Sequence, residues 1–469
     1  MRTQVAVIGS GAGGAVVAYT LAAAGLEVLL IEEGANLNLD HCSPFSLAEM
    51  TSKYRHGGVS AAFGKPKIQY VEGRCLGGGT EINSGLYHRT PPELLAKWQA
   101  LYEVEAIALP DLEPHFQFGE QAVSVSYLPG QPPAASLKLK AGAEAMGWEC
   151  LEVPRWFKYD SHQVGRKQSM TETLIPMAIA QGAVLLTDTW VQSLKYLDQL
   201  WQIQARQRSQ TLTITAETVF VCGGAIQTPA LLQRSGITKN VGRSLQMHPT
   251  VKITARFQEE VNDQQMGVAV HQVKEFLPRF NFGCSISSRA YLGLAMNDHP
   301  AYAWEVDQFW QRMAIYYAAI GSEATGRGNV LSLPGFRDPL VKYQLDQSGL
   351  KVLAEALTKL SELLLAAGAV ALYPSITGSD RLTKTSDLAN LPQILPSHLT
   401  NLITVHLFSS CPMGENRRLC ATDSFGKVFD TKNLYISDAS LLCTALGVNP
   451  QGTIMAIARR NALKFLGKL

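Results

Sequence analysis

The chain of 469 residues has few of the features that mark metal-binding, secreted or nucleic-acid-binding proteins. Its eight cysteines are scattered without a Cys-x-x-Cys pair, which argues against a zinc site and against a disulfide framework. We therefore expect reduced thiols, no bound metal and a cytoplasmic location. The formal net charge is only +2 and no long basic run occurs, so we expect no nucleic acid as a partner.

The sequence also lacks an uninterrupted apolar run of the length that crosses a membrane. The apolar stretch near its start is broken by glycines, and no twin-arginine signal is present, so we expect neither a transmembrane segment nor a secretory signal. With 46% hydrophobic and 17% charged residues, the composition is typical of a globular protein. The length favours two joined domains.

The most informative stretch runs from residue 5 to residue 34. An apolar run meets a glycine-rich turn, an alanine-rich helical segment follows, and a second apolar run ends at Glu32. This pattern predicts a βαβ unit in which Gly9 permits a tight turn, Gly11 lets the backbone approach a pyrophosphate, and Gly14 allows close packing of helix and strand. Glu32 stands where a carboxylate accepts hydrogen bonds from the adenosine ribose, so we expect a dinucleotide cofactor.

A second glycine-rich loop occupies residues 73–85 and contains three consecutive glycines. Such a loop is either a flexible turn or a place where the backbone approaches a ligand closely. Beside a dinucleotide fold we favour the ligand. The loop resembles the G-G-G-S/T-x-x-N motif of the glucose–methanol–choline family of flavin oxidoreductases, which lies beside the flavin. The resemblance implies FAD contacts at Gly78, Gly79, Thr80 and Asn83.

Some relatives in that family carry a histidine, just before this asparagine, that bonds the flavin covalently. This chain has Ile82 there, so the resemblance implies non-covalent FAD. The motifs are most similar to those of the cholesterol oxidase and long-chain alcohol oxidase branches.

The middle of the chain continues the resemblance over residues 165–250. A helix is expected from about Met170 to Ala180, and the resemblance implies that the backbone of Val191 meets adenine. The segment from residue 218 to residue 238 predicts a buried strand and then a helix with Pro229 in its first turn and Gly236 at its end. The segment after it resembles the G-R-N-L-x-x-H-P turn that closes the family's cofactor domain.

The last seventy residues carry the expected chemistry. Residues 405–414 resemble the family's H-x-x-G-T-C-x-M-G segment, with Ser-Ser in place of Gly-Thr, and contain His406. A strand then ends at Asp438 and Ala439, where the family contacts the flavin ribityl chain. Asn449 precedes a helix whose N-terminus would stabilise the electron-rich edge of the flavin ring.

Oxidation of an alcohol moves a hydride from carbon to flavin N5 while the hydroxyl proton goes to a base. Imidazole, with a reference pKa of about 6.5, suits that step near neutral pH. We therefore expect His406 to be the base. The Asn449 carboxamide would hydrogen-bond the substrate oxygen and orient its C–H bond.

The remaining stretches are less informative. Residues 35–70 have little periodicity and are expected to form an extended surface connection. Residues 251–257 and 313–320 alternate as strands of an antiparallel sheet do, and a helix is expected from about residue 350 to residue 367. Six aromatic residues in this region could line a substrate pocket or simply fill the core, and we favour none of them: Tyr302, Trp304, Phe309, Trp310, Tyr316 and Tyr317.

The sequence thus predicts an α/β protein with a Rossmann-like FAD-binding domain, containing a parallel sheet, and a second domain with an antiparallel sheet over the flavin. The FAD-binding domain is expected to comprise residues 1–95, 165–250 and 400–469. The substrate-binding domain is expected to comprise residues 96–164 and 251–399.

The predicted function is FAD-dependent oxidation of the CH–OH group of a small, apolar alcohol, with oxygen or another molecule as electron acceptor. Two alternatives stay open. One is a sugar or polyol dehydrogenase that passes electrons to a quinone or a protein. The other is a flavin-binding module without turnover.

Overall fold

The computed structural model describes residues 1–263, 267–324 and 326–469. Within them, one sheet has seven strands in the order β10-β11-β12-β1-β2-β9, with β23 also paired to β12. The strands β1 (Arg2–Ile8), β2 (Val28–Ile31), β9 (Val184–Leu186), β12 (Gln210–Val221) and β23 (Leu434–Ile436) pair in parallel. The strands β10 (Thr189–Leu197) and β11 (Leu200–Gln207) extend the sheet in antiparallel pairing.

The predicted βαβ unit is confirmed. Helix α1 (Ala12–Ala22) connects β1 to β2. Gly9 has φ +103°, which a residue with a side chain rarely adopts. A Cβ atom at Gly14 would lie 1.8 Å from the Gly9 carbonyl oxygen, so helix and turn pack at a distance that only glycine permits.

The second sheet has nine strands within the described ranges, in the order β3-β4-β21-β14-β17-β16-β15-β6, with β20 also paired to β14. Its central strands β14 (Thr250–Arg256), β17 (Met313–Ile320), β16 (Phe280–Cys284) and β15 (His271–Val273) pair in antiparallel fashion. The edge pair β4 (Ile68–Tyr70) and β21 (Leu402–Thr404) is parallel. The predicted fold class, a parallel sheet combined with a second and largely antiparallel sheet, is therefore confirmed.

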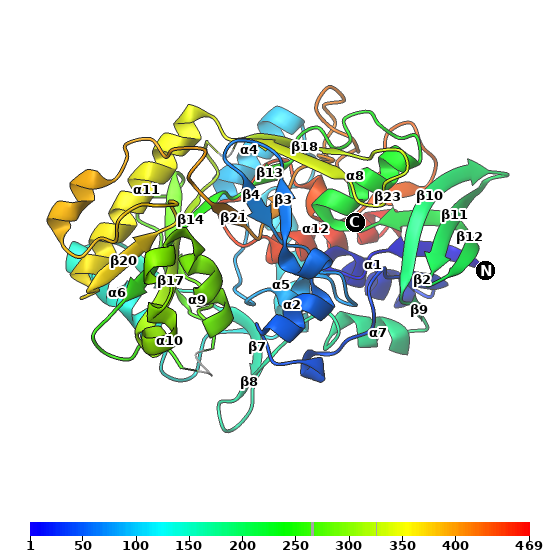
Figure 1. Ribbon diagram of the computed structural model, residues 1–469. Coiled ribbons are helices and arrows are strands. Elements are labelled where there is room, and N and C mark those ends of the chain that lie inside the picture. The colour runs from blue at the N-terminus through cyan, green and yellow to red at the C-terminus, as the bar shows by residue number, and fades with distance from the viewer. Residues whose placement is uncertain (264–266, 325) are drawn as a thin grey trace.

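Helices α6 (Ala134–Met146) and α11 (Gln347–Ala366) cover one face of the second sheet. Figure 1 shows the first sheet at one end of the molecule, beside the N-terminus, and the second sheet extending from the middle towards the other end, with α6 and α11 beside it. In α11, Leu353, Leu357, Leu360 and Leu364 recur at helical spacing and are fully buried. Each such side chain contributes about 2 kcal/mol by burial, so α11 fixes one face of the sheet and leaves the other face to the site.

Helix α12 (Gln451–Phe465) lies near the centre of the molecule and packs against α1 and α5 (Leu109–Ala122). Helix α4 (Pro92–Tyr102) contains Trp98, which is fully buried. Within the expected second-domain stretch 96–164, α5 thus packs on α12 while α6 packs on the second sheet. The division into two domains stays a proposal.

Residues 35–70 do not form the extended connection that we expected. They contain α2 (Leu47–Lys53), β3 (Ser60–Ala62) and β4, and the last two strands belong to the second sheet. Strands of three residues are too short to produce a periodic pattern, and they form because a neighbouring strand supplies their hydrogen bonds.

The helix after β12 also begins earlier than predicted. Helix α8 spans Gly224–Arg234, so Pro229 lies inside it rather than in its first turn. The start is fixed by Asp438, which accepts a hydrogen bond from the Gly224 N–H and comes from a distant part of the chain. Gly236, with φ +81°, follows the end of the helix as predicted.

Other expected elements are confirmed with small shifts. Helix α7 spans Leu174–Ala180, β17 has the predicted limits, and α11 begins three residues before the expected start. No helix in the described ranges is long and apolar enough to cross a membrane.

Candidate active site

A cavity of about 480 Å³ is lined by both sheets and by the segments that precede α12. Its walls include all but one of the residues to which the sequence assigned a cofactor-binding or catalytic role. Gly14 is the exception, because its role is to pack α1 against the turn. The residues that line it are Gly9, Gly11, Glu32, Gly78, Gly79, Thr80, Asn83, Val191, His406, Asp438, Ala439 and Asn449.

One end of the cavity presents uncommitted backbone N–H groups. Helix α1 begins after Gly11 with no side-chain cap and no acidic residue in its first turn. A Cβ atom at Gly11 or at Gly79 would meet no described atom within 4 Å, so both backbones are open to the cavity. A helix N-terminus of this kind binds phosphate groups, and the residues present therefore fit a dinucleotide pyrophosphate.

Two buried carboxylates flank this end. Glu32 accepts hydrogen bonds from the Ser10 N–H (3.0 Å), the Ser10 hydroxyl (2.6 Å) and the Gly34 N–H (2.8 Å). Burial raises its pKa, although these three bonds oppose the rise. One oxygen of Asp438 accepts bonds from the Gly224 N–H and the Thr228 hydroxyl, and the other accepts from the Ser440 N–H.

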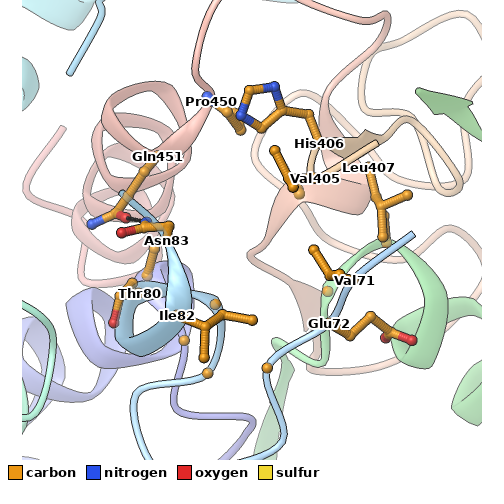
Figure 2. A pocket seen from close by; sticks show the side chains of 18 of the residues that line it. Val71, Glu72, Thr80, Ile82, Asn83, Val405, His406, Leu407, Pro450 and Gln451 are labelled. Carbon is orange, nitrogen blue, oxygen red and sulfur yellow. Dashed lines mark hydrogen bonds between the residues drawn. The ribbon is translucent and has the colours of Figure 1, made fainter. Parts of the chain in front are cut away.

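The second glycine loop is joined to α12 by side chains. Asn83 donates from Nδ2 to Oε1 of Gln451 at 2.6 Å, as Figure 2 shows. Thr80, in the short helix α3 (Gly79–Ile82), donates to the Gly77 carbonyl and accepts from the Met170 N–H. The loop is therefore held rigidly against the first residue of α12.

Val191, in β10, and Ala439, which follows β23, both line the cavity. Val191 is buried in β10 next to a β-bulge, and its carbonyl accepts from Arg234 at 3.3 Å. Ala439 follows Asp438 directly, and its carbonyl accepts from the Ser409 N–H at 3.2 Å. Ser409 has φ +66°, which explains why the family segment has glycine where this chain has serine.

The other end of the cavity contains His406. Its Nδ1 lies 3.0 Å from Nδ1 of His248, and its Nε2 lies 3.3 Å from the Asn449 side chain. Figure 2 shows His406 beside Pro450, the residue that precedes α12. Helix α12 has no side-chain cap and no acidic residue in its first turn, so its N-terminus leaves a positive potential near this end of the cavity.

The hydrogen bonds order the protons of the two histidines. Nε2 of His248 accepts from the Gly447 N–H at 2.8 Å, so a neutral His248 carries its proton on Nδ1. That proton is donated to Nδ1 of His406, and a neutral His406 consequently carries its proton on Nε2. The Asn449 atom placed 3.3 Å from this Nε2 is Nδ2, so this proton order requires the amide to be reversed, with its oxygen accepting from the Nε2–H.

Both histidines are held neutral. Burial lowers the pKa of His406 to about 4, and the charge of Lys274 contributes. Burial likewise places the pKa of His248 well below its usual value, with His406 and Lys274 contributing. At neutral pH this end of the cavity therefore offers neutral imidazole groups.

Sequence reasoning missed several cavity residues that come from the second sheet. Of the six aromatic candidates, only Tyr317 lines the cavity. Tyr316 is buried and donates to the Ala135 carbonyl, and Trp304 is exposed. Lys252, Gln272 and Lys274 also line the cavity. The only available signal was the alternation of polar and apolar residues in β14, which predicted a strand but not what its polar face contacts.

Comparison with known proteins now decides the family. Models of GMC oxidoreductases match residues 50–250 and 327–458, and a pyridine nucleotide-disulphide oxidoreductase model matches residues 3–83. An uncharacterised GMC-type oxidoreductase of Sinorhizobium fredii is 38% identical over 98% of this chain and 94% of its own length. The chain belongs to the GMC oxidoreductase family. It is therefore an FAD-dependent oxidoreductase that acts on CH–OH donors.

More distant relatives of this GMC oxidoreductase have names that refer to different alcohols. A long-chain-alcohol oxidase of Arabidopsis thaliana is 23% identical over 98% of this chain and 67% of its own length. The crystal structure of pyridoxine 4-oxidase from Mesorbium loti has a TM-score of 0.76 at 17% identity and covers 99% of both chains. The latter match shows a shared fold. The predicted family resemblance is thus confirmed.

Proposed function

We propose that this GMC oxidoreductase oxidises the CH–OH group of an organic alcohol to a carbonyl, with non-covalently bound FAD as hydride acceptor. The observation that carries the proposal is that His406 and Asn449 line the same cavity as the two glycine motifs. When bound, FAD supplies the ring that accepts the hydride. Ile82 occupies the position at which relatives bond the flavin covalently, which supports non-covalent binding.

Several groups of this chain would hold the cofactor. The free N–H groups at the start of α1 and the open backbone at Gly79 would bind the pyrophosphate. Glu32 lies at the end of β2, where it would contact the ribose, and Asp438 would contact the ribityl chain. Val191 and Ala439 would contribute backbone contacts, and Asn83 would act through its bond to Gln451.

We assign proton removal to Nε2 of His406. In the resting neutral pair this atom already carries a proton, so it can accept the alcohol proton only after the pair exchanges tautomers. In that exchange the Nε2 proton of His406 leaves to solvent and the Nδ1 proton of His248 moves to Nδ1 of His406. His248 takes a proton from solvent on Nε2, which breaks its hydrogen bond with the Gly447 N–H. His248 would thereby control when His406 acts as a base.

Asn449 has a different proposed role. Its amide contacts His406 and cannot titrate, so it would hydrogen-bond the alcohol oxygen and fix the direction of the C–H bond. The identity of the alcohol is not carried over from the relatives, because their printed names cover substrates of different chemistry.

Anaerobic reduction tests the proposal. The purified protein should be yellow, and addition of a substrate from a broad alcohol panel should bleach the flavin absorption. Release of hydrogen peroxide in air would identify oxygen as the acceptor, whereas reduction of a dye alone would indicate a quinone or protein acceptor. A yellow protein that no alcohol bleaches would contradict the proposal and favour a binding module.

A further inference from the structure

Two lysines lie on the face of the second sheet that forms the cavity wall. Across β14, β17, β16 and β15, Lys252 is opposite Tyr317, Tyr317 is opposite Gly283, and Gly283 is opposite Gln272. Directly opposite residues of an antiparallel sheet point to the same side. Lys274 follows Gln272 by two residues and also lines the cavity.

Neither ammonium group forms an ion pair within the part of the chain that the structure describes. Among the described residues, no ion pair or side-chain hydrogen bond involves Nζ of Lys252 or Lys274. Burial lowers the pKa of each to about 8, and only the exposed Glu149 opposes this for Lys274. Both groups are therefore mainly protonated at neutral pH. Burying a cation without a partner is strongly unfavourable. The two lysines therefore indicate that the ligand of this cavity carries negative charge.

The carboxylates that line the same cavity have partners of their own. Glu33 and Glu72 lie within ion-pair distance of Arg55, at 2.5 and 3.7 Å. Glu32 is bonded to Ser10, and Asp438 to Gly224 and Thr228. None of these acids is paired with either lysine, so the positive charge on the wall formed by the second sheet is left for a ligand.

Neutral donors lie between the two lysines. Gln272 is 2% exposed, and its Nε2 donates to the Tyr317 hydroxyl at 3.1 Å. The Tyr317 proton is then uncommitted; with the amide reversed, Tyr317 would donate to Oε1 and the Nε2 protons would be uncommitted. Oε1 of Gln272 is buried without a partner among the described residues. A Cβ at Gly283 would lie 2.3 Å from the Tyr317 hydroxyl oxygen, so glycine provides the room for that ring.

The positive charge is close to the reacting end of the cavity. Burial lowers the pKa of His406, and the positive charge of Lys274 lowers it further. The same charge also lowers the pKa values of His248 and His88. Asn281 lies in β16, between β17 and β15, and donates to the Gly447 carbonyl at 3.2 Å. This bond connects the second sheet to the segment that contains Asn449. Because His406 and Lys274 line the same cavity, a ligand that contacts His406 can extend to Lys274.

We propose that the substrate is an alcohol that carries an anionic group, a carboxylate or a phosphate, and that Lys274 and Lys252 bind this group with help from Tyr317 and Gln272. This inference rests on the proposed function, because it concerns the same cavity. It replaces the expectation of an apolar alcohol, which came from the resemblance to long-chain alcohol oxidases and not from any residue of the cavity.

Binding of simple anions to the yellow holoprotein tests the proposal without turnover. Benzoate and inorganic phosphate are titrated while the flavin spectrum and the heat of binding are recorded. Lys274→Met and Lys252→Met should each weaken the affinity about tenfold or more, because each removes a charge-assisted hydrogen bond. The exposed Lys342→Met should leave the affinity unchanged. Affinity should also fall as the pH rises through about 8, where the lysines lose their charge.

Two further readouts separate this role from others. Lys274 is buried and Lys252 is half-buried, and neither ammonium group has a partner among the described residues. The methionine variants should therefore melt at the same or a higher temperature than the wild type. Their FAD content should be unchanged. Wild-type protein that binds neither anion, variants that bind anions as well as the wild type, or variants that lose FAD instead of anion affinity would each overturn the proposal.

Matched alcohols keep this inference distinct from the proposed function. The anaerobic bleaching rate with 4-hydroxymethylbenzoate is compared with that of 4-methylbenzyl alcohol, and glycerol phosphate with glycerol. Faster bleaching by the anionic member of at least one pair supports the inference. Faster bleaching by both neutral members overturns it and leaves the oxidation intact. Anion binding without bleaching by any alcohol would contradict the proposed function and leave the anion site standing.

Discussion

A neutral histidine offers only one lone pair, and the fold decides which nitrogen of His406 keeps it. The Gly447 N–H fixes His248, and His248 fixes His406. The sequence motifs predicted that His406 lies at the site, but they contain no information about its tautomer. The tautomer depends on the backbone N–H of Gly447, which comes close to His248 only in the folded protein. The histidine of the turn at residues 241–249 was seen only as part of a closing segment.

Replacing His248 tests this control. In His248→Phe, Nδ1 of His406 loses the donated hydrogen bond while burial persists. The pKa of His406 should rise from about 4 by about one unit, because such a bond contributes about 1 kcal/mol to the neutral form. The base is active only when deprotonated, so the low-pH limb of the flavin reduction rate should move to higher pH. The exposed His398→Phe serves as the control. If the low-pH limb of His248→Phe lies at the same pH as that of this control, His248 does not lower the pKa of His406.

Asn449 should matter for orientation and not for proton transfer. Asn449→Ala is expected to slow anaerobic flavin reduction by about tenfold to a hundredfold, the scale of a lost orienting hydrogen bond. Its pH profile should keep the limbs of the wild type. A shifted limb without a slower rate would contradict this role, and Asn449→Ser, which keeps a short polar group, serves as the milder comparison.

At the scale of elements, the first βαβ unit was predictable because each part has a local signal. The second sheet was predictable only in part: its strands β14 and β17 were expected, but β3 and β4 are three residues long, and nothing local showed that polar residues of β14 turn to a cavity. Alternation identifies two faces of a strand, but only the packed structure shows which of them meets solvent. The start of α8 was missed for a related reason, because its partner Asp438 lies more than two hundred residues away.

Two glycines of α1 and its turn provide a matched test. Gly14→Ala should destabilise the protein by about 3 kcal/mol or more, because the new Cβ would meet the Gly9 carbonyl oxygen at 1.8 Å. Gly11 has φ −64° and open space around its Cβ position, so Gly11→Ala should fold normally. Its Cβ would instead occupy the proposed pyrophosphate site and weaken FAD binding about tenfold or more. Melting curves and FAD titrations of both variants check the pair; equal FAD affinity of Gly11→Ala and wild type would contradict the placement.

At the scale of the whole molecule, the cavity joins segments from both ends of the chain. Residues from the segments 8–13, 78–85, 248–252 and 447–451 line the same cavity. The sequence predicted that the head and tail of the chain meet around a flavin. It predicted an antiparallel sheet over the flavin but not which residues of that sheet line the cavity, since the identity of these residues depends on strand register.

Bound FAD should therefore stabilise the entire protein. A ligand at a hundred times its dissociation constant adds about 2.7 kcal/mol to the free energy of unfolding when it binds only the folded state. The melting temperature of the flavin-free protein should rise with added FAD in a concentration-dependent manner, whereas riboflavin, which lacks the pyrophosphate, should raise it less. A melting temperature that does not respond to FAD would contradict the assigned site.

The rate of anaerobic flavin reduction in His406→Ala tests the central claim most directly. The account predicts that this variant keeps its yellow flavin and its FAD affinity, while reduction by the alcohol that bleaches the wild type slows by a factor of about a thousand, the scale of general base catalysis. Reduction at the wild-type rate in a variant that still binds FAD would contradict the claim that His406 faces the reacting alcohol.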